Sequence, residues 1–414
     1  LKNGHMAVVI KGSGSIEGST GLEMGANGTT EIRGQVNVAV GSSVAGVSTA
    51  TQFTPSEVAT SNRNLITNGE MRVAQRGASV TTGTGNFAAY TLDQWKISTY
   101  ATDQLNLTVT QEAMNQAVPG LANFIKVSPN AAETALAADE YTNLRQVIEA
   151  QDLQRLKWGT ASAESLTLSF WVKSNTTGTA GLTFNKHDAT SYYITRTYTI
   201  NTADTWEKKS VTIPGLTPSG IANDTGMGLN VYWFLSAGSD YTSSDSTSWV
   251  TTGDSKYAYG HAINLTDSTS DYLALTGVQL EVGEQATAFE HRSYDYEFAR
   301  CRRYYQVLIE GDAGGSEKSF GNATCYNTSS LHLTVKLDPE MRTTPTADFG
   351  TGTNYFKVFY NNTYDRFDAF TLAGNSSKRV VDMYADSGVS VTAAASGLLR
   401  TNNASAKVAF TAEL

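Results

Sequence analysis

The stretch Leu273–Val282 constrains the fold of this chain more than any other, because its apolar residues alternate and then change parity at Gly277. The two sets are Leu273 and Leu275 before the glycine, and Val278, Leu280 and Val282 after it. Alternation indicates a half-buried strand, and a glycine at a parity switch is typical of a β-bulge or a bend. We therefore predict a closing strand of one β-domain, then a short helix that leads into a new strand within Tyr294–Tyr305.

Alternation recurs along most of the chain and is clearest over Ser165–Ser174, where Leu166, Leu168, Phe170 and Val172 share one face. Further strands are expected at residues 90–100, 105–109, 124–127, 145–149, 182–200, 205–213, 229–235, 304–309, 331–337, 355–360, 380–383, 389–391 and 407–410, with one helical turn at 152–157. Charged residues make up only 17% of the chain, and the Ser, Thr, Asn and Gly that replace them favour turns and β-surfaces. No period of 20–50 residues repeats, which excludes solenoids and propellers.

These patterns predict an all-β chain: a jelly-roll β-sandwich followed by a smaller C-terminal β-sandwich, with a Gly-rich N-terminal attachment arm. Residues 1–5 look like a remnant of an expression tag. The expected divisions are the arm at 6–61, the jelly roll at 62–300 and the C-terminal domain at 301–414.

Charge and composition bear on partners and compartment. The formal net charge is −9 and no basic run occurs, so we expect no nucleic-acid partner. No stretch of about 18 apolar residues occurs, and Met6–Ile10 is too short for a secretory signal, so we expect no membrane insertion. Cys301 and Cys325 allow at most one internal disulfide, which suggests folding in a reducing cytoplasm.

Several motifs, in order, resemble those of phage tail-fibre and related virion proteins that carry a jelly roll similar to carbohydrate-binding modules. They are FWVKS, TWEKKSVTIPG, GLNVYWFLSAG, TGVQLEVG, ATAFEHRSY and CRRYY, and the resemblance spans roughly Asn62–Arg300. The opening MAVVIKGSGSIEG resembles the N-termini of phage fibre proteins, and LDPEMRTTPT resembles a recurring phage fibre motif.

The resemblance implies a virion fibre protein, assembled in the host cytoplasm, that forms a homotrimer and binds host-surface polysaccharide. The N-terminal arm would attach it to other virion proteins. NLITNGE would begin the jelly roll with a strand at Leu65–Ile66, and Glu70 would help to hold a structural calcium ion. Calcium takes 6–8 oxygen ligands, so one glutamate does not establish such a site.

No catalytic motif is found, and we expect a protein that is not an enzyme. The sequence holds no GxSxG elbow, no HExxH or CxxC spacing and no phosphate loop. The candidate acids for glycoside hydrolysis lie mostly in turns: Asp240, Asp245, Asp254, Asp267 and Asp271. Two alternatives stay open, namely a purely structural head fibre or decoration protein, and a polysaccharide depolymerase.

The remaining chemistry is binding through aromatic side chains, because sugars stack their apolar faces on rings and pair their hydroxyls with polar groups. Tyr232 and Trp233 point to opposite faces of a strand, so at least one of them can face a groove. The candidates that lie in or beside polar loops are Tyr192, Tyr193, Tyr241, Trp249, Tyr257 and Tyr259.

Overall fold

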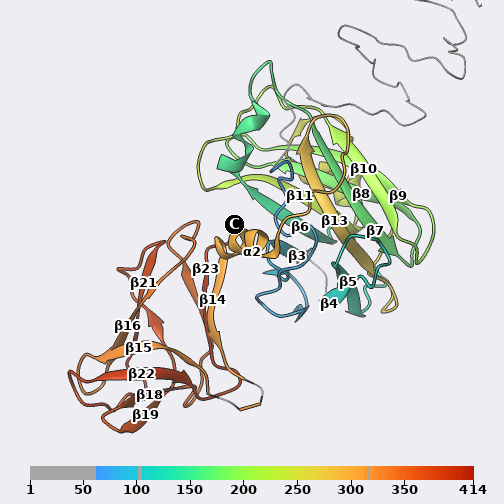
Figure 1. Cartoon of the computed structure of the whole chain (residues 1–414). Coiled ribbons are helices and arrows are strands. Elements are labelled where there is room, and N and C mark those ends of the chain that lie inside the picture. The colour runs from blue at the N-terminus through green and yellow to red at the C-terminus, as the bar shows by residue number, and fades with distance from the viewer. Residues whose placement is uncertain (1–61, 101–104, 313, 316) are drawn as a thin grey trace, which may run out of the picture. The chain divides into compact units, whose positions relative to one another are not determined.

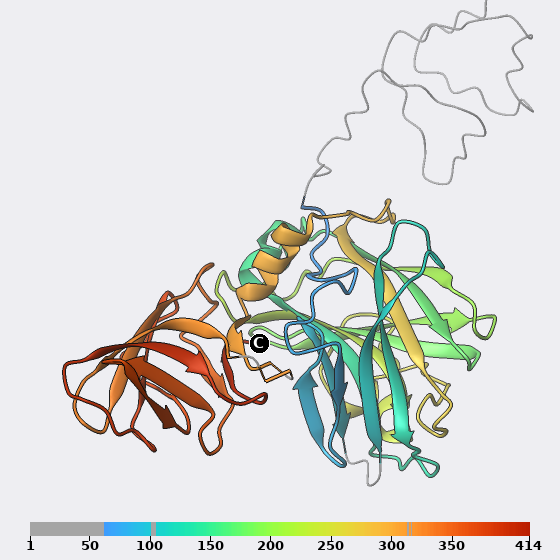
Figure 2. The same ribbon diagram turned by 60° about the horizontal axis from the view of Figure 1, so that its bottom comes forward.

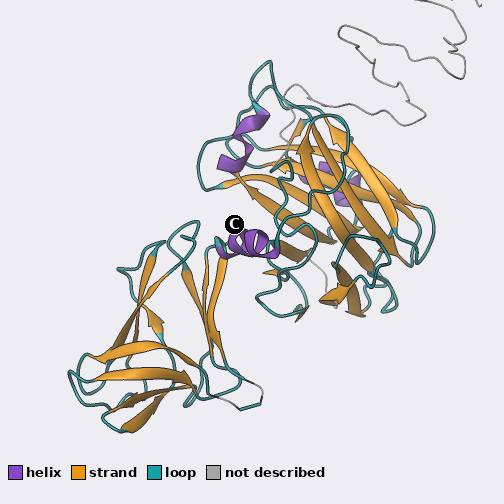
Figure 3. Ribbon diagram, in the orientation of Figure 1, coloured by secondary structure: helices purple, strands orange, loops and turns teal. Residues whose placement is uncertain are grey.

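The computed structural model describes residues 62–100, 105–312, 314–315 and 317–414. The predicted arm at 6–61 lies outside the described residues. Those residues form the strands β1 to β23 and four short helical elements, and every strand pairing among them is antiparallel (Figures 1 and 3). The prediction of an all-β chain built from sandwiches is therefore confirmed.

The first sandwich consists of two sheets. The six-stranded sheet has the order β1 (Ser79–Thr81), β4 (Asn106–Ala113), β5 (Asn123–Ala131), β13 (Leu273–Val282), β7 (Leu166–Ser174) and β10 (Glu207–Ile213). The seven-stranded sheet has the order β12 (Val250–Thr251), β9 (Tyr192–Ile200), β8 (Gly178–Lys186), β11 (Met227–Ala237), β6 (Tyr141–Glu149), β3 (Trp95–Tyr100) and β2 (Phe87–Tyr90). Most neighbouring strands in these two sheets are distant in sequence, so the fold depends on long-range strand pairing.

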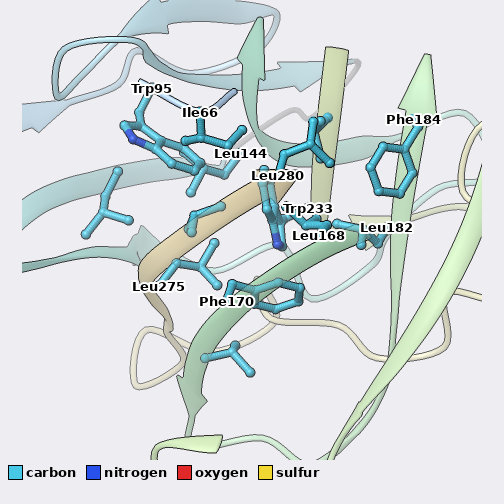
Figure 4. Packing of buried hydrophobic residues seen from close by; sticks show 14 of the residues in the cluster. Ile66, Trp95, Leu144, Leu168, Phe170, Leu182, Phe184, Trp233, Leu275 and Leu280 are labelled. Carbon is cyan, nitrogen blue, oxygen red and sulfur yellow. The ribbon is translucent and has the colours of Figure 1, made fainter. Parts of the chain in front are cut away.

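The core of this sandwich lies between the two sheets, and side chains from both fill it (Figure 4). Trp233 of β11 is fully buried there, with its ring centroid 5.4 Å from that of Trp95 and 5.8 Å from that of Phe170. The predicted strand over Ser165–Ser174 is present as β7, and the four residues expected to share one face, Leu166, Leu168, Phe170 and Val172, all face this core.

The predicted bulge at Gly277 is confirmed. Gly277 has φ +57°, and the pairing of β13 with β7 shifts between Thr276 and Gln279. Because the shift compensates the change of parity, Leu275 before it and Leu280 after it are both fully buried in the same core.

The expected first strand at Leu65–Ile66 is absent, since residues 62–78 form no strand. One backbone bond to β13 is made here, from Leu65 N to Leu280 O (2.8 Å). The Asn64 side chain makes the others: its Nδ2 donates to Val278 O (3.0 Å), and its Oδ1 accepts from the N–H groups of Ile66 (2.9 Å) and Leu280 (3.0 Å). The Glu290 carboxylate accepts from Asn64 N (2.9 Å), so a side-chain clasp holds this segment to β13.

The second sandwich follows α2 (Tyr294–Arg302) and has one core of its own. Its three-stranded sheet has the order β14 (Tyr305–Glu310), β23 (Lys407–Thr411) and β17 (Thr346–Phe349). Its seven-stranded sheet has the order β19 (Thr363–Phe367), β18 (Phe356–Tyr360), β22 (Ser396–Thr401), β15 (Ser319–Cys325), β16 (Leu331–Lys336), β21 (Val380–Ala385) and β20 (Thr371–Leu372). The expected strand at Val389–Val391 is instead an irregular segment whose two valines are buried.

The helical elements are short. The 3₁₀ helix η1 (Ala150–Leu156) follows β6 and corresponds to the predicted turn, and α1 (Ser239–Thr242) and η2 (Asp254–Lys256) lie between β11 and β13. The predicted helix before the new strand at Tyr305 is α2, which begins after its N-cap Ser293. In the described part of the chain, no helix has the length and apolar character needed to cross a membrane.

Residues of the two sandwiches are joined by hydrogen bonds. Arg342 donates from Nη1 to Thr225 O (2.7 Å) and from Nε to Ala412 O (2.7 Å). Gln75 Nε2 donates to Tyr305 O (2.8 Å). The last residues also contact the first sandwich, since the Tyr90 hydroxyl donates to Leu414 O (2.6 Å) and Arg76 pairs with Glu413 (2.7 Å).

Candidate functional site

The face of the seven-stranded sheet that points away from the core is rich in tyrosine. Alternation along β11 places Tyr232 and Phe234 on this outer face, opposite Trp233. Tyr141 of β6 and Tyr193 of β9 pack with them in one cluster. The sequence thus builds two aromatic layers on one sheet, one inside the core and one outside it.

Part of the outer layer is covered by the connection between β11 and β13. Tyr257, which follows η2 in this connection, is 8% exposed and lies at the centre of the cluster. Its ring centroid is 4.9 Å from Phe234, 5.1 Å from Tyr232, 5.2 Å from Tyr141, 5.4 Å from Tyr193 and 6.1 Å from Tyr241. Burial raises the pKa of Tyr257 well above its ordinary value, so its phenol stays neutral.

The end of the face near β2 and β3 is open and forms a pocket of about 270 Å³. Tyr100 of β3 is 44% exposed and stacks on Tyr141, with 5.4 Å between ring centroids and 10° between ring planes. The stack arises because the register of β3 on β6 places the two residues opposite each other. The pocket is lined by Asn86, Phe87, Ala88, Ser98, Thr99, Tyr100, Tyr141, Arg145 and Tyr257.

Arg145 supplies the charge of this pocket. Its guanidinium lies 5.6 Å from the ring centroid of Tyr232, and Nη1 donates to the Tyr232 hydroxyl at 3.4 Å. Its Nε is buried and has no hydrogen-bond partner among the described residues, and the same is true of Ser98 Oγ. A buried polar atom without a partner is costly, and both of these atoms belong to residues that line the pocket.

The structure brings together four of the sequence-predicted residues: Tyr232, Tyr241 and Tyr257 form one cluster, and Tyr193 packs against it. Tyr232, Tyr241 and Tyr257 are at most 8% exposed, and of the four only Tyr257 lines the open pocket. These tyrosines hold Tyr141 and Arg145 in position: Tyr241 and Tyr257 pack against the Tyr141 ring, and Tyr232 packs against the Arg145 guanidinium.

The other candidates lie elsewhere. Trp233 is fully buried in the sandwich core, where its ring has no face to offer a ligand. Tyr192 is half-buried against the same core. Trp249 packs edge-on against Trp158 at 5.2 Å and donates its indole N–H to Pro214 O (2.8 Å). Tyr259 is half-buried outside the tyrosine cluster.

Sequence reasoning missed Tyr100, Tyr141 and Arg145. The alternation of β3 was recognised from Trp95 and Ile97, and it places Tyr100 on the opposite face. The signal for Tyr100 was therefore present. The stack on Tyr141 depends on the register between two strands that are distant in sequence, which no local pattern gives.

The residues around Glu70 do not fit the calcium site that the resemblance implies. Glu70 Oε1 accepts the N–H of Ala122 (2.9 Å), while Oε2 lies 4.0 Å from Arg72 Nη1 and 3.7 Å from His291 Nδ1. Calcium requires several oxygen ligands, whereas a guanidinium and an imidazole are what stand beside this carboxylate. Over the described ranges, no group of three or more His, Cys, Asp or Glu side chains is placed to hold a metal ion.

Comparison with known proteins gives only remote likenesses. No family model and no curated protein matches the sequence. Among solved structures, the enzymatically active domain of tailspike protein 4 of bacteriophage CBA120 is 13% identical with a TM-score of 0.29, and the match covers 53% of this chain and 21% of that one. The chain thus spans about a fifth of the tailspike domain's length.

Two carbohydrate-binding structures match at a similar level. The family 11 carbohydrate-binding module of a cellulosomal cellulase from Clostridium thermocellum is 12% identical with a TM-score of 0.26, over 50% of this chain and 100% of that one. A CBM22 tandem domain from Paenibacillus barcinonensis is 11% identical with a TM-score of 0.25, over 86% of this chain and 100% of that one. TM-scores this low carry no weight for fold or function, which rest on the chain's own sheets and side chains.

Proposed function

We propose that this protein binds carbohydrate in the open pocket on the outer face of its seven-stranded sheet. The observation that carries the proposal is the stacked pair Tyr100 and Tyr141 beside the guanidinium of Arg145, all three of which line the pocket. An exposed ring presents a flat apolar surface for the C–H face of a sugar, and a fixed donor next to it sets the orientation of the hydroxyls. The pocket lining contains no Asp or Glu, so it supplies no carboxylate pair for glycoside hydrolysis.

Substitution of Tyr100 tests this site. Tyr100→Ala removes the exposed ring, and we expect binding to an immobilised glycan array to weaken by about tenfold, since an aromatic contact is worth about 0.5–1.5 kcal/mol beyond its area. Tyr326→Ala is the matched control, because Tyr326 is 73% exposed and lies in the second sandwich. Equal binding by wild type and Tyr100→Ala, or a loss confined to Tyr326→Ala, would contradict the assignment.

The biological setting that we propose is a non-enzymatic phage virion fibre, in which a homotrimer recognises host-surface polysaccharide. This step rests on the resemblance of TGVQLEVG, ATAFEHRSY and LDPEMRTTPT to motifs of phage fibre proteins. Three copies would turn shallow contacts into firm attachment through a high effective concentration. The N-terminal arm would join the fibre to other virion proteins.

Three measurements test the setting separately from the pocket. Native mass spectrometry should give three times the chain mass, and an antibody against the protein should label intact phage particles in electron micrographs. Purified protein should compete with particles for adsorption to host cells. Labelled particles combined with no glycan binding and no competition would favour the purely structural alternative, and release of reducing ends from host polysaccharide would favour the depolymerase.

A further inference from the structure

A second pocket, of about 510 Å³, lies between the start of the described chain, the 3₁₀ helix η1 and helix α2. Figure 2 shows α2, in orange, next to the blue start of the described chain. The pocket shares no lining residue with the Tyr100–Tyr141 pocket. Its lining consists of Asn62, Asn64, Leu65, Thr67, Gln151, Asp152, Arg155, Tyr296, Arg300, Arg303 and Tyr304.

The lining is cationic although the chain carries a net charge of −9. Arg303 is neutralised by Glu149, at 2.6 Å. The other charged residues of the lining are Arg155, Arg300 and Asp152, so the lining carries a net charge of 2 − 1 = +1. A local positive charge on an acidic protein indicates an anionic ligand rather than a general surface property.

Arg155 is held rigidly at the pocket wall. Its Nη1 donates to Asn62 O (3.0 Å) and its Nη2 to Arg63 O (2.9 Å), whereas its Nε is buried without a hydrogen-bond partner in the described chain. Carbonyl oxygens fix the guanidinium but carry no formal charge to pair with it, and no carboxylate is hydrogen-bonded to it in the described chain. Burial lowers the pKa of Arg155, and the neighbouring Glu290 and Asp152 only partly oppose this shift, so an anion in the pocket would stabilise the charged form further.

Arg300 is the second cationic group and is available to a ligand. It is half-buried on α2, between the buried Glu297 and Cys301 on one side and the pocket on the other. Among the described residues its guanidinium forms no hydrogen bond and no ion pair. An arginine presents a planar fork of donors that matches carboxylate and phosphate oxygens. Arg300 can therefore bind a carboxylate or phosphate without breaking a hydrogen bond or an ion pair to another residue of the described chain.

Tyr296 completes the pocket for a sugar. Its ring is 45% exposed, and its hydroxyl donates to Asn62 Oδ1 (2.9 Å), which fixes the ring at the pocket mouth. The volume falls within the range of small-ligand sites. An exposed ring beside two guanidinium groups suits a ring-shaped ligand that carries an oxyanion.

We propose that this pocket binds an acidic sugar, through a carboxylate or phosphate group that pairs with Arg300 and Arg155. The site is separate from the proposed carbohydrate pocket, and its assignment does not depend on that proposal. Together the two pockets would let one protein bind both an uncharged sugar face and an anionic group of a glycan.

Calorimetric titration of the full chain tests the proposal with four probes: trigalacturonic acid, maltotriose, glucose 6-phosphate and glucose. We expect the charged member of at least one pair to bind about tenfold or more tightly than its neutral counterpart, because a hydrogen bond to a charged group contributes about 1.5–3 kcal/mol. Binding of the uronate alone identifies a carboxylate ligand, and binding of the sugar phosphate alone identifies a phosphate ligand. Equal affinity for charged and neutral probes would overturn the proposal.

Charge reversal then locates the site. Arg300→Glu should abolish the preference for the charged probe, whereas Lys208→Glu, which makes the same charge change at an exposed position outside the pocket, should retain it. Arg300→Gln, which is milder, should lower the affinity without reversing the charge if Arg300→Glu fails to fold. Tyr100→Ala should leave binding of the charged probe intact, and an equal loss in Arg300→Glu and Lys208→Glu would refute the assignment.

Discussion

The buried carboxylate of Glu149, at the end of β6, accepts two hydrogen bonds from the guanidinium of Arg303, which lies 154 residues further along the chain (2.9 Å from Nε and 2.6 Å from Nη2). The Tyr304 hydroxyl donates to the same carboxylate at 2.8 Å. The Glu149 side chain is fully buried and that of Arg303 is 25% exposed. This bidentate pair ties the first sandwich to the chain that leads into the second.

We expect Arg303→Met to lower the free energy of unfolding by about 3–5 kcal/mol, because it leaves the Glu149 charge buried without its cation. Urea unfolding followed by tryptophan fluorescence measures the change. The double variant Glu149→Gln/Arg303→Met should recover part of the loss, since it removes the unpaired charge as well.

The control for this pair is Lys157→Met. Lys157 pairs with Glu164 at 2.8 Å, but the two side chains are 50% and 36% exposed. An exposed pair contributes about 0–1 kcal/mol, so little change is expected. Equal effects of Arg303→Met and Lys157→Met would show that the Glu149 pair contributes no more than a surface ion pair.

A second prediction concerns Gly69, where the start of the described chain meets β13. A Cβ at this position would lie 2.2 Å from the carbonyl oxygen of Val278, a backbone atom that cannot move aside. Val278 N also donates to Gly69 O at 2.9 Å, so the two segments are already in contact. Gly69→Ala should therefore cost about 1–3 kcal/mol or more, as overpacking does.

Thermal unfolding of Gly69→Ala and Gly253→Ala provides the comparison. A Cβ at Gly253 would meet nothing within 4 Å, so that variant should unfold like the wild-type protein. If both variants keep the wild-type Tm, the contact between Gly69 and Val278 leaves room for a methyl group in solution.

The alternation of apolar and polar residues predicted those strands and turns that depend on side chains close together in the sequence. The alternation of β7 is visible in ten residues, and the glycine at the parity change of β13 identified the bulge at Gly277. The expected strand at Leu65–Ile66 failed for the opposite reason. There the backbone makes one bond to β13, from Leu65 N to Leu280 O, and the side chains of Asn64 and Glu290, which are 226 residues apart, make the others, so the apolar pair is buried without a regular ladder.

The candidate site was only partly predictable for a similar reason. Loop tyrosines such as Tyr257 were recognised, but their burial follows from how their loop folds onto the sheet. Alternation required one of Tyr232 and Trp233 to face outward, yet it did not say which. The open stack of Tyr100 on Tyr141 requires the register of β3 on β6, which only the three-dimensional structure supplies.

A third prediction concerns Glu70 and calcium. The Glu70 carboxylate is already occupied by the Ala122 N–H and stands beside Arg72. We expect the difference between the Tm with calcium and the Tm with a chelator to be the same for the wild-type protein and for Glu70→Gln. A calcium-dependent stabilisation that disappears in Glu70→Gln would restore the calcium site that the sequence resemblance implies.

A fourth prediction is a pH dependence set by His261. This side chain lies against the outer face of the seven-stranded sheet, with its ring centroid 6.1 Å from that of Phe234, is 8% exposed, and accepts the N–H of Gly181 at Nδ1 (3.0 Å). Burial lowers the pKa of His261 from 6.5 to about 4. The imidazole is therefore neutral in the folded protein at pH values where the unfolded chain already binds a proton.

The sign of the effect follows from proton binding. Above about pH 7, His261 is neutral in both states and contributes no pH dependence. As the pH falls from 6.5 towards 4, the unfolded chain takes up a proton that the folded protein excludes, so the free energy of unfolding decreases, by about 3 kcal/mol in total. His261→Asn keeps an acceptor for Gly181 and removes the titration, so its stability should fall less steeply over this range.

Urea unfolding at pH 7.5, 6, 5 and 4 measures the difference between the wild-type protein and His261→Asn, which should shrink by up to about 3 kcal/mol towards low pH. Other groups that titrate in this range contribute equally to both proteins and cancel in the difference. His187→Asn, at an exposed position in the connection between β8 and β9, should show the wild-type profile. A constant difference between wild type and His261→Asn from pH 7.5 to 4 would mean that the folded protein binds a proton at His261 as readily as the unfolded chain does.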